Sequence, residues 1–298
     1  MIYDVIIIGL GISGITASIY AKRSGLNVAV INYGLPGGII GESSTVENYP
    51  GFKSIGGMEL AINFFEHFNS LDVPLFTEEV IDIKLETNFK RIITKNNEYY
   101  ANAVIVCSGR KPKKLGIKDE DKFLGKGISY CATCDGNLYK GKTVCVVGGG
   151  NSALESVMYL SNLCKEVYLL VRKDKVIGDS SLLKEIETLN NVVIKYNTFI
   201  NETNTLDNKI IGVVTNNGNI DLDGIFVNIG YEPSVGILKS LDINYENNYI
   251  LVDKNMETNI KGIYACGDII KKDLYQLVTA ASDGAIAANH VFKMSKAK

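Results

Sequence analysis

Short apolar runs alternate with helical patterns along this chain, and the alternation predicts parallel α/β units. Residues 3–8 form a β-branched run that ends at Gly9, residues 13–24 carry apolar and small residues at helical spacing, and residues 27–31 form a second apolar run. This order of strand, turn, helix and strand predicts a β-α-β unit at the start of the chain.

The same order of elements is repeated in the middle of the chain. Residues 143–147 predict a strand, residues 148–153 a glycine-rich turn, residues 153–163 a helix and residues 166–171 another strand. A Gly-x-Gly-x-x-Gly string alone is weak evidence, but both copies follow a strand and open a helix. We therefore expect two dinucleotide-type units.

The remaining chain adds short strands and one long helix. Residues 192–194, 210–215 and 224–229 predict strands or hairpins separated by Asn, Asp and Gly. Residues 263–265 predict a strand that leads into a Gly-Asp turn, and residues 276–292 a helix rich in alanine and glycine. The small residues of this helix would permit close packing of two backbones.

Composition and charge indicate a folded, soluble protein without a broad electrostatic partner. The chain has 298 residues, 46% of them hydrophobic, with a net charge of −2 and a mean hydropathy of +0.09. The near-neutral charge gives no reason to expect nucleic acid or an anionic membrane as partner. The apolar start contains Asp4 and lacks a basic leader, and no apolar run is long enough to span a membrane, so a cytoplasmic protein is expected.

One local excess of positive charge stands out between residues 110 and 126. Its members are Arg110, Lys111, Lys113, Lys114, Lys118, Lys122 and Lys126, diluted by three acidic residues. A solvated linker is the first interpretation of such a run, and a docking surface for an acidic protein is the second.

The first glycine-rich turn has the spacing that a dinucleotide requires. Gly9 permits the tight turn, Gly11 the close approach of a pyrophosphate, and Gly14 the close packing of the helix. The N-terminus of the helix then faces the phosphate charge. The alternative is a glycine-rich turn without a ligand. Asn32 stands where an acidic residue often holds the ribose.

Four of the six cysteines are expected to be structural, because they lie in or beside apolar strand and helix patterns: Cys107, Cys145, Cys164 and Cys266. The other two, Cys131 and Cys134, form a Cys-x-x-Cys motif. Zinc would need two more ligands at matching spacing, and the chain has no second such motif and only two histidines. We therefore expect a redox pair and no metal, with Asp135 as a positioned acid, over the alternative of two incidental cysteines.

In combination these motifs resemble the low-molecular-weight thioredoxin reductases over essentially the whole chain. The motifs that carry the resemblance are Gly9 to Gly14; Pro36-Gly37-Gly38; Val46-Glu47-Asn48-Tyr49-Pro50-Gly51; Cys107-Ser108-Gly109; Tyr130-Cys131-Ala132-Thr133-Cys134-Asp135-Gly136; Gly148 to Ala153; and Ala265-Cys266-Gly267-Asp268 with Gln276 ahead of the alanine-rich helix.

The resemblance implies a homodimer with one FAD per chain and thioredoxin as the partner. It implies that Cys134 faces the flavin, that Cys131 attacks the substrate disulfide, and that the two domains swing against each other. The residues it assigns to FAD are Gly9, Gly11, Gly14, Gly37, Gly38, Asn48, Gly267, Asp268 and Gln276.

The expected fold class is α/β, with two Rossmann-like dinucleotide-binding domains of the FAD/NAD(P)-binding three-layer ββα type. The FAD domain would comprise residues 1–112 and 240–298. The NAD(P)H-like domain with the redox cysteines would be inserted between them as residues 113–239.

The chain departs from the NADPH-dependent members at the nucleotide loop. Those members have a His-Arg-Arg-x-x-x-Arg stretch. In this chain Val171 replaces the histidine, Lys173 and Ile177 replace two of the arginines, and only the arginine at Arg172 remains. These departures make NADPH doubtful and look like the ferredoxin-dependent flavin thioredoxin reductases.

Two further departures are Tyr275 in place of an arginine and Ile39 in place of a glutamine. We therefore favour reduced ferredoxin as the electron donor, with NADPH as the alternative. A flavin-dependent dithiol oxidase and a redox sensor without turnover are the remaining possibilities.

Overall fold

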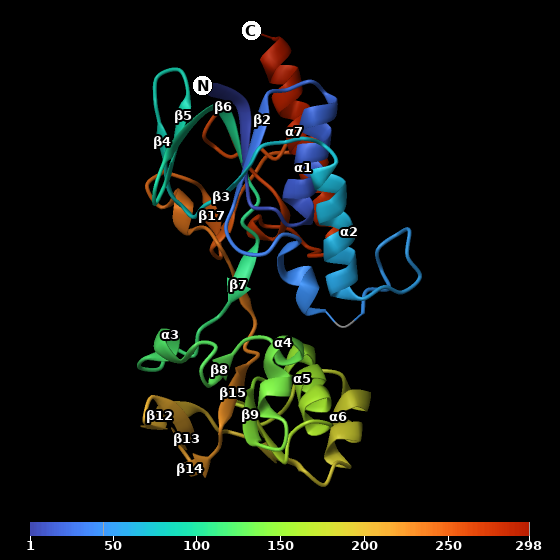
Figure 1. Ribbon diagram of the computed structural model, residues 1–298, viewed down its shortest axis with the longest axis vertical. Helices are drawn as coiled ribbons and strands as arrows, with labels where there is room; N and C mark the ends of the chain where they lie inside the picture. The colour runs from blue at the N-terminus through green and yellow to red at the C-terminus, as the bar shows by residue number, and fades with distance from the viewer. Residues whose placement is uncertain (44, 298) are drawn as a thin grey trace. The chain divides into compact units, whose positions relative to one another are not determined.

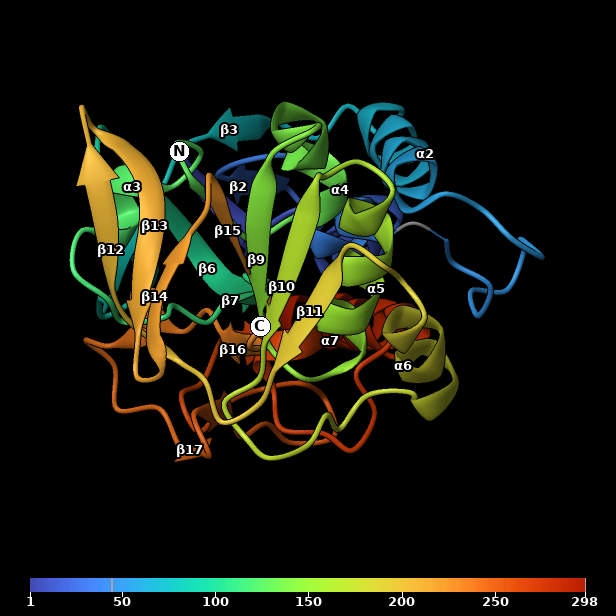
Figure 2. The ribbon, with the colours of Figure 1, turned by 90° about the horizontal axis from the view of Figure 1, so that it is seen from below.

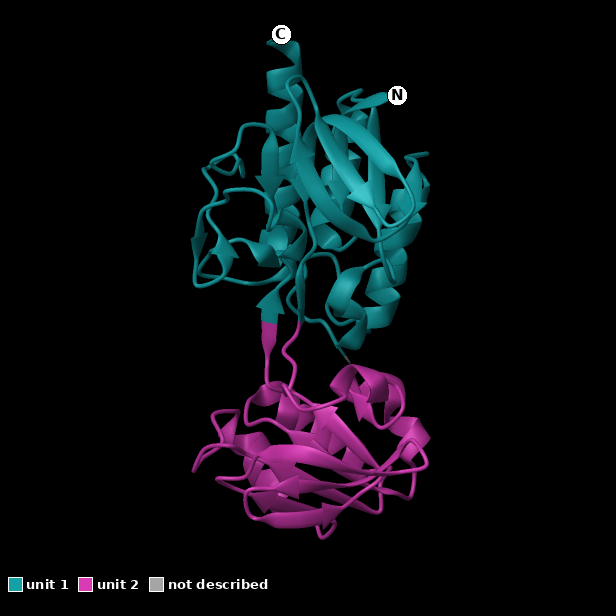
Figure 3. Cartoon of the chain, turned by 90° about the vertical axis from the view of Figure 1, so that its left-hand side faces the viewer, with its two compact units in different colours: residues 1–111, 232–298 teal, residues 112–231 magenta. Residues whose placement is uncertain are grey.

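The computed structural model describes residues 1–43 and 45–297, which divide into two compact units (Figure 3). Unit 1 comprises residues 1–111 and 232–298, and unit 2 comprises residues 112–231. The chain returns to unit 1 eight residues earlier than the expected end of the inserted domain at residue 239. The reason is that Leu238 is fully buried in the core of unit 1 and so belongs to that unit.

Unit 1 contains the first glycine-rich turn and the long C-terminal helix. Its helices are α1 (Ile12–Arg23), α2 (Gly57–Asn69) and α7 (Leu277–Lys296), with the 3₁₀ helices η1 (Gly38–Glu42), η3 (Gly236–Leu238) and η4 (Gly267–Ile269). Its strands are β1 (Ile2–Ile8), β2 (Val28–Asn32), β3 (Leu75–Thr77), β4 (Val80–Leu85), β5 (Lys90–Thr94), β6 (Glu98–Val106), β17 (Tyr245–Glu246), β18 (Tyr249–Ile250) and β19 (Ile263–Ala265).

A seven-stranded sheet organises the described part of unit 1, in the order β3-β2-β1-β6-β5-β4 with β19 also paired to β6. The strands β3, β2, β1, β6 and β19 are parallel, and the hairpin β4–β5 is antiparallel to β6. β1 is buried on both faces because α1, α2 and α7 cover one side (Figure 1) and a second apolar cluster covers the other. The hairpin β4–β5 was not among the expected elements.

α1 and α7 approach each other closely at a glycine. A Cβ atom on Gly284 would lie 2.1 Å from the carbonyl oxygen of Ser13, so no other residue fits there without moving a backbone. The expected role of the small residues in α7 is therefore met at this point. The contact brings the C-terminal segment of the chain against the helix that follows the first glycine-rich turn.

Unit 2 contains the second glycine-rich turn and the cysteine pair. Its helices are α3 (Glu120–Phe123), α4 (Ala132–Asp135), α5 (Asn151–Ser161) and α6 (Ser180–Glu187), with the 3₁₀ helix η2 (Gly136–Tyr139). Its strands are β8 (Ile128–Ser129), β9 (Thr143–Val147), β10 (Glu166–Leu170), β11 (Val192–Lys195), β12 (Ile200–Leu206), β13 (Lys209–Thr215), β14 (Gly218–Asp221) and β15 (Gly224–Val227). Strands β7 (Arg110–Pro112) and β16 (Tyr231–Pro233) contain the points at which the chain passes between the units.

Unit 2 has three layers, and its parallel sheet is the middle one. The order of this sheet is β11-β10-β9-β15-β8. Helices α5 and α6 cover one face, and the antiparallel sheet β12-β13-β14 covers the other (Figure 2). Both units thus have the strand, turn and helix order that the sequence predicts, and the expected fold class is confirmed. Among the described residues, no helix is both long and apolar enough to cross a lipid bilayer.

Candidate functional site

At two of its glycines, the first glycine-rich turn in unit 1 is so close to other backbone atoms that no side chain fits. Gly9 has a φ of +99°, and a Cβ atom there would lie 2.4 Å from the carbonyl oxygen of Cys107. A Cβ atom on Gly14 would lie 1.9 Å from the carbonyl oxygen of Gly9. Both glycines are therefore required by the packing of the turn against α1 and the end of β6.

Gly11 has a different environment, because it is open. A Cβ atom there would meet no other atom within 4 Å, and Gly11 is the N-cap of α1 without a side-chain hydrogen bond to the first turn. No side chain therefore caps this helix end, and there is space beside Gly11. Uncapped N–H groups and the positive end of a helix form a binding site for a phosphate.

A second glycine pair extends this surface. The N–H of Gly37 donates to the carbonyl oxygen of Leu10 at 2.8 Å, and Gly37 has a φ of +94°. A Cβ atom on Gly38 would lie 3.4 Å from Cα of Gly11. Gly37 and Gly38 therefore lie against the first turn, as a common binding surface requires.

The side chain of Asn32 makes hydrogen bonds to two loops beside the first glycine-rich turn. Its Oδ1 accepts the N–H of Leu10 at 2.9 Å, its Nδ2 donates to the carbonyl oxygen of Gly34 at 3.0 Å, and the residue is buried. The sequence suggested a weaker substitute for a ribose-binding acid at this position. The structure instead assigns its amide to holding the two loops together.

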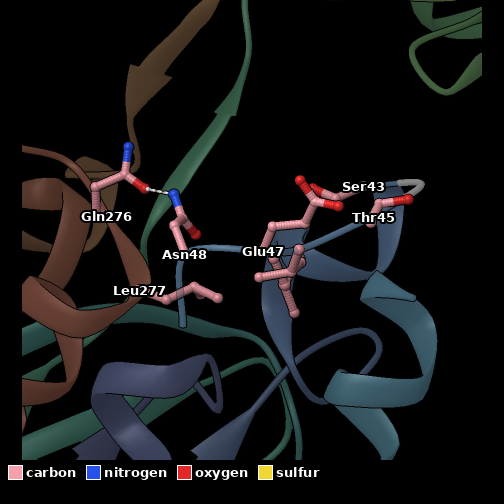
Figure 4. A pocket seen from close by; sticks show the side chains of 8 residues that line it. Ser43, Thr45, Glu47, Asn48, Gln276 and Leu277 are labelled. Carbon is pink, nitrogen blue, oxygen red and sulfur yellow. Dashed lines mark hydrogen bonds between the residues drawn. The ribbon is translucent and has the colours of Figure 1, made fainter. Parts of the chain in front are cut away.

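A cavity of about 570 Å³ lies beside these loops in unit 1 (Figure 4). It is lined by Ile40, Ser43, Thr45, Val46, Glu47, Asn48, Gln276 and Leu277. The Nδ2 of Asn48 donates to Oε1 of Gln276 at 2.9 Å, and Gln276 is the N-cap of α7. The structure therefore brings Asn48 and Gln276 together at one edge of the cavity.

The turn after β19 packs against the start of α1. Gly267 has a φ of +80°, and a Cβ atom there would lie 2.7 Å from Oγ of Ser13. Its N–H donates to Oδ2 of Asp283 at 3.0 Å, and Nζ of Lys272 lies 2.8 Å from the same oxygen. The ion pair of Lys272 and Asp283 was not predicted, because no sequence pattern links two residues that are eleven positions apart.

Asp268 forms an ion pair that the sequence did not indicate. The Arg110 guanidinium lies 2.7 Å from Oδ2 of Asp268, and it lies over the ring of Tyr275, 5.0 Å from the centroid. Nζ of Lys272 lies 5.8 Å from the same centroid, and the ring of Tyr249 packs at 5.3 Å. Tyr275, a departure from the resemblance, is thus held by two cations and an aromatic ring.

These features of unit 1 fit a flavin dinucleotide. The open helix N-terminus at Gly11 is suited to the pyrophosphate, and the polar cavity edge at Asn48 and Gln276 is suited to a ring with hydrogen-bonding atoms. The Gly267 turn lies beside α1, so its neighbour Asp268 belongs to the same part of the unit.

The redox cysteines lie in unit 2, between β8 and η2. Cys131 and Cys134 form a disulfide with a Cα–Cα distance of 5.3 Å, and Cys131 is half-buried whereas Cys134 is exposed. The Sγ of Cys131 accepts the N–H of Cys134 at 3.2 Å. When the disulfide is reduced, this N–H favours a thiolate on Cys131, because a hydrogen bond to the charged form stabilises it.

Asp135 is held in place by a buried serine. The Oγ of Ser129 donates to Oδ2 of Asp135 at 2.7 Å, and Ser129 Oγ accepts the N–H of Cys131 at 3.0 Å. One hydroxyl therefore joins the carboxylate to the backbone of the redox motif. Ser129 was missed in the sequence because a serine at the end of a short strand carries no distinctive pattern.

The four other cysteines are buried and unpaired in disulfides, as expected. Burial raises the pKa of the Cys164 thiol to about 11 and raises the pKa of Cys145 further. Burial likewise raises the pKa of Cys266, whose thiol also neighbours Cys107. High pKa values keep these thiols protonated and unreactive.

The second glycine-rich turn, in unit 2, opens helix α5 in the same manner as the first. Gly150 is an N-cap without a side-chain hydrogen bond, and Asn151 Oδ1 accepts the N–H of Asp179 at 2.7 Å. The loop after β10 exposes three cations near this helix end, namely Arg172, Lys173 and Lys175. A phosphate group is the chemistry that such a loop can recognise.

The basic stretch after β6 is less available than its sequence suggested. Lys111 lies 3.3 Å from Glu232, and Lys114 lies 2.6 Å from Asp121. With Arg110 held by Asp268, three of its cations have carboxylate partners in their own unit. This pairing weakens the interpretation as a docking surface for an acidic protein.

Comparisons with known proteins agree with these sites. A family model described as pyridine nucleotide-disulphide oxidoreductase matches residues 3–285. The thioredoxin reductase of Mycoplasma genitalium is 40% identical over 294 residues, which cover 96% of this chain and 93% of the relative.

Solved structures give the same picture. The thioredoxin reductase of Lactococcus lactis has a TM-score of 0.88 and 33% identity, with 99% of this chain and 100% of that chain covered. A ferredoxin-flavin thioredoxin reductase of Clostridium acetobutylicum has a TM-score of 0.57 and 32% identity, with 99% of both chains covered.

Proposed function

Because the chain belongs to the pyridine nucleotide-disulphide oxidoreductase family and is one of its thioredoxin reductases, we propose that it uses NADPH to reduce the disulfide of a thioredoxin. The enzyme is a flavoprotein that binds FAD. Bound FAD supplies the two-electron transfer between the nucleotide and the protein disulfide. The disulfide of Cys131 and Cys134 in unit 2 is the observation on which the proposal rests.

The reduced cysteine pair carries out the exchange with thioredoxin. Asp135 accepts the proton of the Cys131 thiol, and the Cys131 thiolate attacks one sulfur of the substrate disulfide; a mixed disulfide forms, and the released substrate thiolate takes that proton from Asp135. Asp135 then accepts the proton of Cys134, whose thiolate attacks the Cys131 sulfur; the internal disulfide re-forms, and the second substrate thiolate leaves and is protonated by Asp135. The N–H of Cys134 near Cys131 and the Ser129 hydroxyl on Asp135 support these roles.

We assign FAD to unit 1. Gly9, Gly11 and Gly14 would hold the pyrophosphate with Gly37 and Gly38 beside them. Asn48 and Gln276 would contact the ring system from the cavity, with Gly267 and Asp268 nearby. We assign the nucleotide site to the second turn, at residues 148–153 of unit 2. The resemblance supports a homodimer and a cytoplasmic location.

NADPH is the proposed donor because the loop after β10 retains positive charge. Arg172, Lys173 and Lys175 are exposed there and outnumber the single acidic residue between them, Asp174. The description of the matching family, pyridine nucleotide-disulphide oxidoreductase, supports the same donor class. NADPH thus replaces ferredoxin, which the sequence favoured.

Ferredoxin is the second candidate donor. Val171 and Ile177 stand where the NADPH-dependent members have a histidine and an arginine, and the Clostridium acetobutylicum relative is named as a ferredoxin-flavin enzyme. The paired cations of the basic stretch give a ferredoxin less to bind, which makes this candidate the weaker one.

Anaerobic mixing tests the proposal. The oxidised enzyme is mixed with NADPH and then with oxidised thioredoxin, while the flavin absorbance band is followed. We expect NADPH at micromolar concentration to bleach the band and thioredoxin to restore it, with thiols appearing on thioredoxin. Bleaching by reduced ferredoxin alone would replace NADPH as the donor.

Two other outcomes would replace the proposed reaction itself. Rapid oxygen consumption with small dithiols, without thioredoxin reduction, would indicate a dithiol oxidase. No turnover with either donor, together with a partner complex that survives Cys134→Ser, would indicate a redox sensor.

A further inference from the structure

Arg110 links two residues of unit 1 that both precede α7 in the sequence, Asp268 and Tyr275. Its guanidinium contacts the Asp268 carboxylate at 2.7 Å, and it lies 5.0 Å from the centroid of the Tyr275 ring. Asp268 follows the Gly267 turn, and Tyr275 precedes Gln276 at the cavity. A single side chain therefore contacts both segments that approach the FAD site from the C-terminal part of the chain.

The ion pair of Arg110 and Asp268 is partly shielded from solvent. The side chains of Arg110 and Asp268 are 23% and 17% exposed, whereas surface ion pairs of the same unit such as Lys95 and Glu79 are 64% and 40% exposed. Partly buried pairs are screened less by water, and removal of one partner leaves the other charge unpaired.

The backbone that precedes Asp268 is fixed by its neighbours. Gly267 packs against Ser13 of α1, and its N–H is held by Asp283, which in turn pairs with Lys272. Lys272 also lies over the Tyr275 ring, at 5.8 Å. Cations within about 6 Å of an aromatic ring attract it, so Tyr275 is fixed from two directions.

We propose that Arg110 is a positioning residue of the FAD site, which holds the Asp268 carboxylate and the Tyr275 ring in the orientation that the bound flavin requires. The inference rests on the assignment of Asp268 to FAD. Arg110 also compensates the negative charge of Asp268, and an uncompensated carboxylate near a flavin disfavours its reduced, anionic form.

The test compares FAD binding to apoprotein with the stability of that apoprotein. Arg110→Ala is expected to weaken FAD binding about 10-fold, as for loss of one partner of a partly buried pair, and to make the flavin midpoint potential more negative. Arg110→Lys, which keeps the charge, should restore most of the potential and part of the affinity.

Arg91→Ala is the matched control, because Arg91 pairs with Glu86 and Glu98 on the hairpin of the same unit. It should change the thermal midpoint of the apoprotein and leave FAD affinity and the potential unaltered. If Arg110→Ala behaves like Arg91→Ala, Arg110 is merely structural and the proposal is overturned.

A double-mutant cycle separates the proposal from its premise. If Arg110 acts through Asp268, Arg110→Ala should weaken FAD binding much less in the Asp268→Asn background than in the wild type. Additive effects would overturn the proposed link. Unaltered FAD binding in both single variants would overturn the assignment of Asp268 as well, whereas the thioredoxin reductase reaction is judged separately by turnover.

Discussion

Asn48 donates a hydrogen bond of 2.9 Å to Gln276, although 228 positions of sequence separate them. The contact joins the loop that follows η1 to the first residue of the capping box of α7, at the edge of the cavity in unit 1. The N-terminal and C-terminal segments of unit 1 therefore both contribute to the surface of this cavity.

Loss of this contact should weaken FAD binding. Asn48→Ala removes one hydrogen-bonding group from the cavity and leaves the Gln276 carbonyl without its partner, so we expect about a 10-fold increase in the FAD dissociation constant. Titration of apoprotein with FAD measures it. Asn63→Ala on the exposed face of α2 is the control and should bind FAD as the wild type does.

Gly11→Ala and Gly14→Ala should separate binding from folding. A methyl group at Gly11 enters open space in front of α1, so the apoprotein should keep its stability and lose FAD affinity. At Gly14 the methyl group would meet the Gly9 carbonyl, and we expect about 1–3 kcal/mol of destabilisation or more. Urea unfolding of both apoproteins, with FAD titration, checks this. Equal stability losses in the two variants would contradict it.

Alkylation should distinguish the redox cysteines from the rest. After reduction of the native enzyme, iodoacetamide near pH 8 should modify Cys131 and Cys134 only, because burial raises the pKa of Cys164 to about 11 and keeps that thiol protonated. The thiolate of Cys164 becomes abundant only as the pH approaches that value. Mass spectrometry of peptides reads the sites, and denatured protein should be modified at all six cysteines.

Ser129 should influence the exchange reaction through Asp135. Asp135→Asn is expected to slow thioredoxin reduction by about 10²-fold, as for loss of a general acid. Ser129→Ala, which removes the 2.7 Å hydrogen bond, should slow it by about 10-fold. Combined, the two changes should cause little more loss than Asp135→Asn alone. Ser161→Ala on α5 is the control, and the measurement is the rate of thiol release from thioredoxin.

Arg172 should determine the affinity for NADPH. Arg172→Ala is expected to raise KM for NADPH by about 10- to 100-fold, from loss of one charge-assisted contact of roughly 1.5–3 kcal/mol, with kcat nearly unaltered. KM for NADH should not change, because NADH lacks the 2′-phosphate. Lys165→Ala, at the opposite end of β10, is the control. Equal effects on both nucleotides would remove Arg172 from the phosphate site.

Local patterns in the sequence were sufficient for the two dinucleotide units and the redox motif. Gly9, Gly11 and Gly14 lie within six positions between β1 and the first turn of α1; backbone contacts require glycine at Gly9 and Gly14, and Gly11 leaves the helix end open. The spacing of Cys131 and Cys134 likewise predicts a disulfide without reference to the rest of the chain. Strand and helix periodicities then predict the alternating order of elements.

Contacts between distant segments could not be predicted in this way. The pairing of Arg110 with Asp268 converts part of an apparent basic surface into internal ion pairs, and Ser129 gains its importance only because β8 ends beside Asp135. The hairpin β4–β5 and the early return of the chain to unit 1 also depend on which apolar faces pack together. Sequence spacing constrains neighbours along the chain, whereas burial and charge pairing depend on residues that folding alone brings into contact.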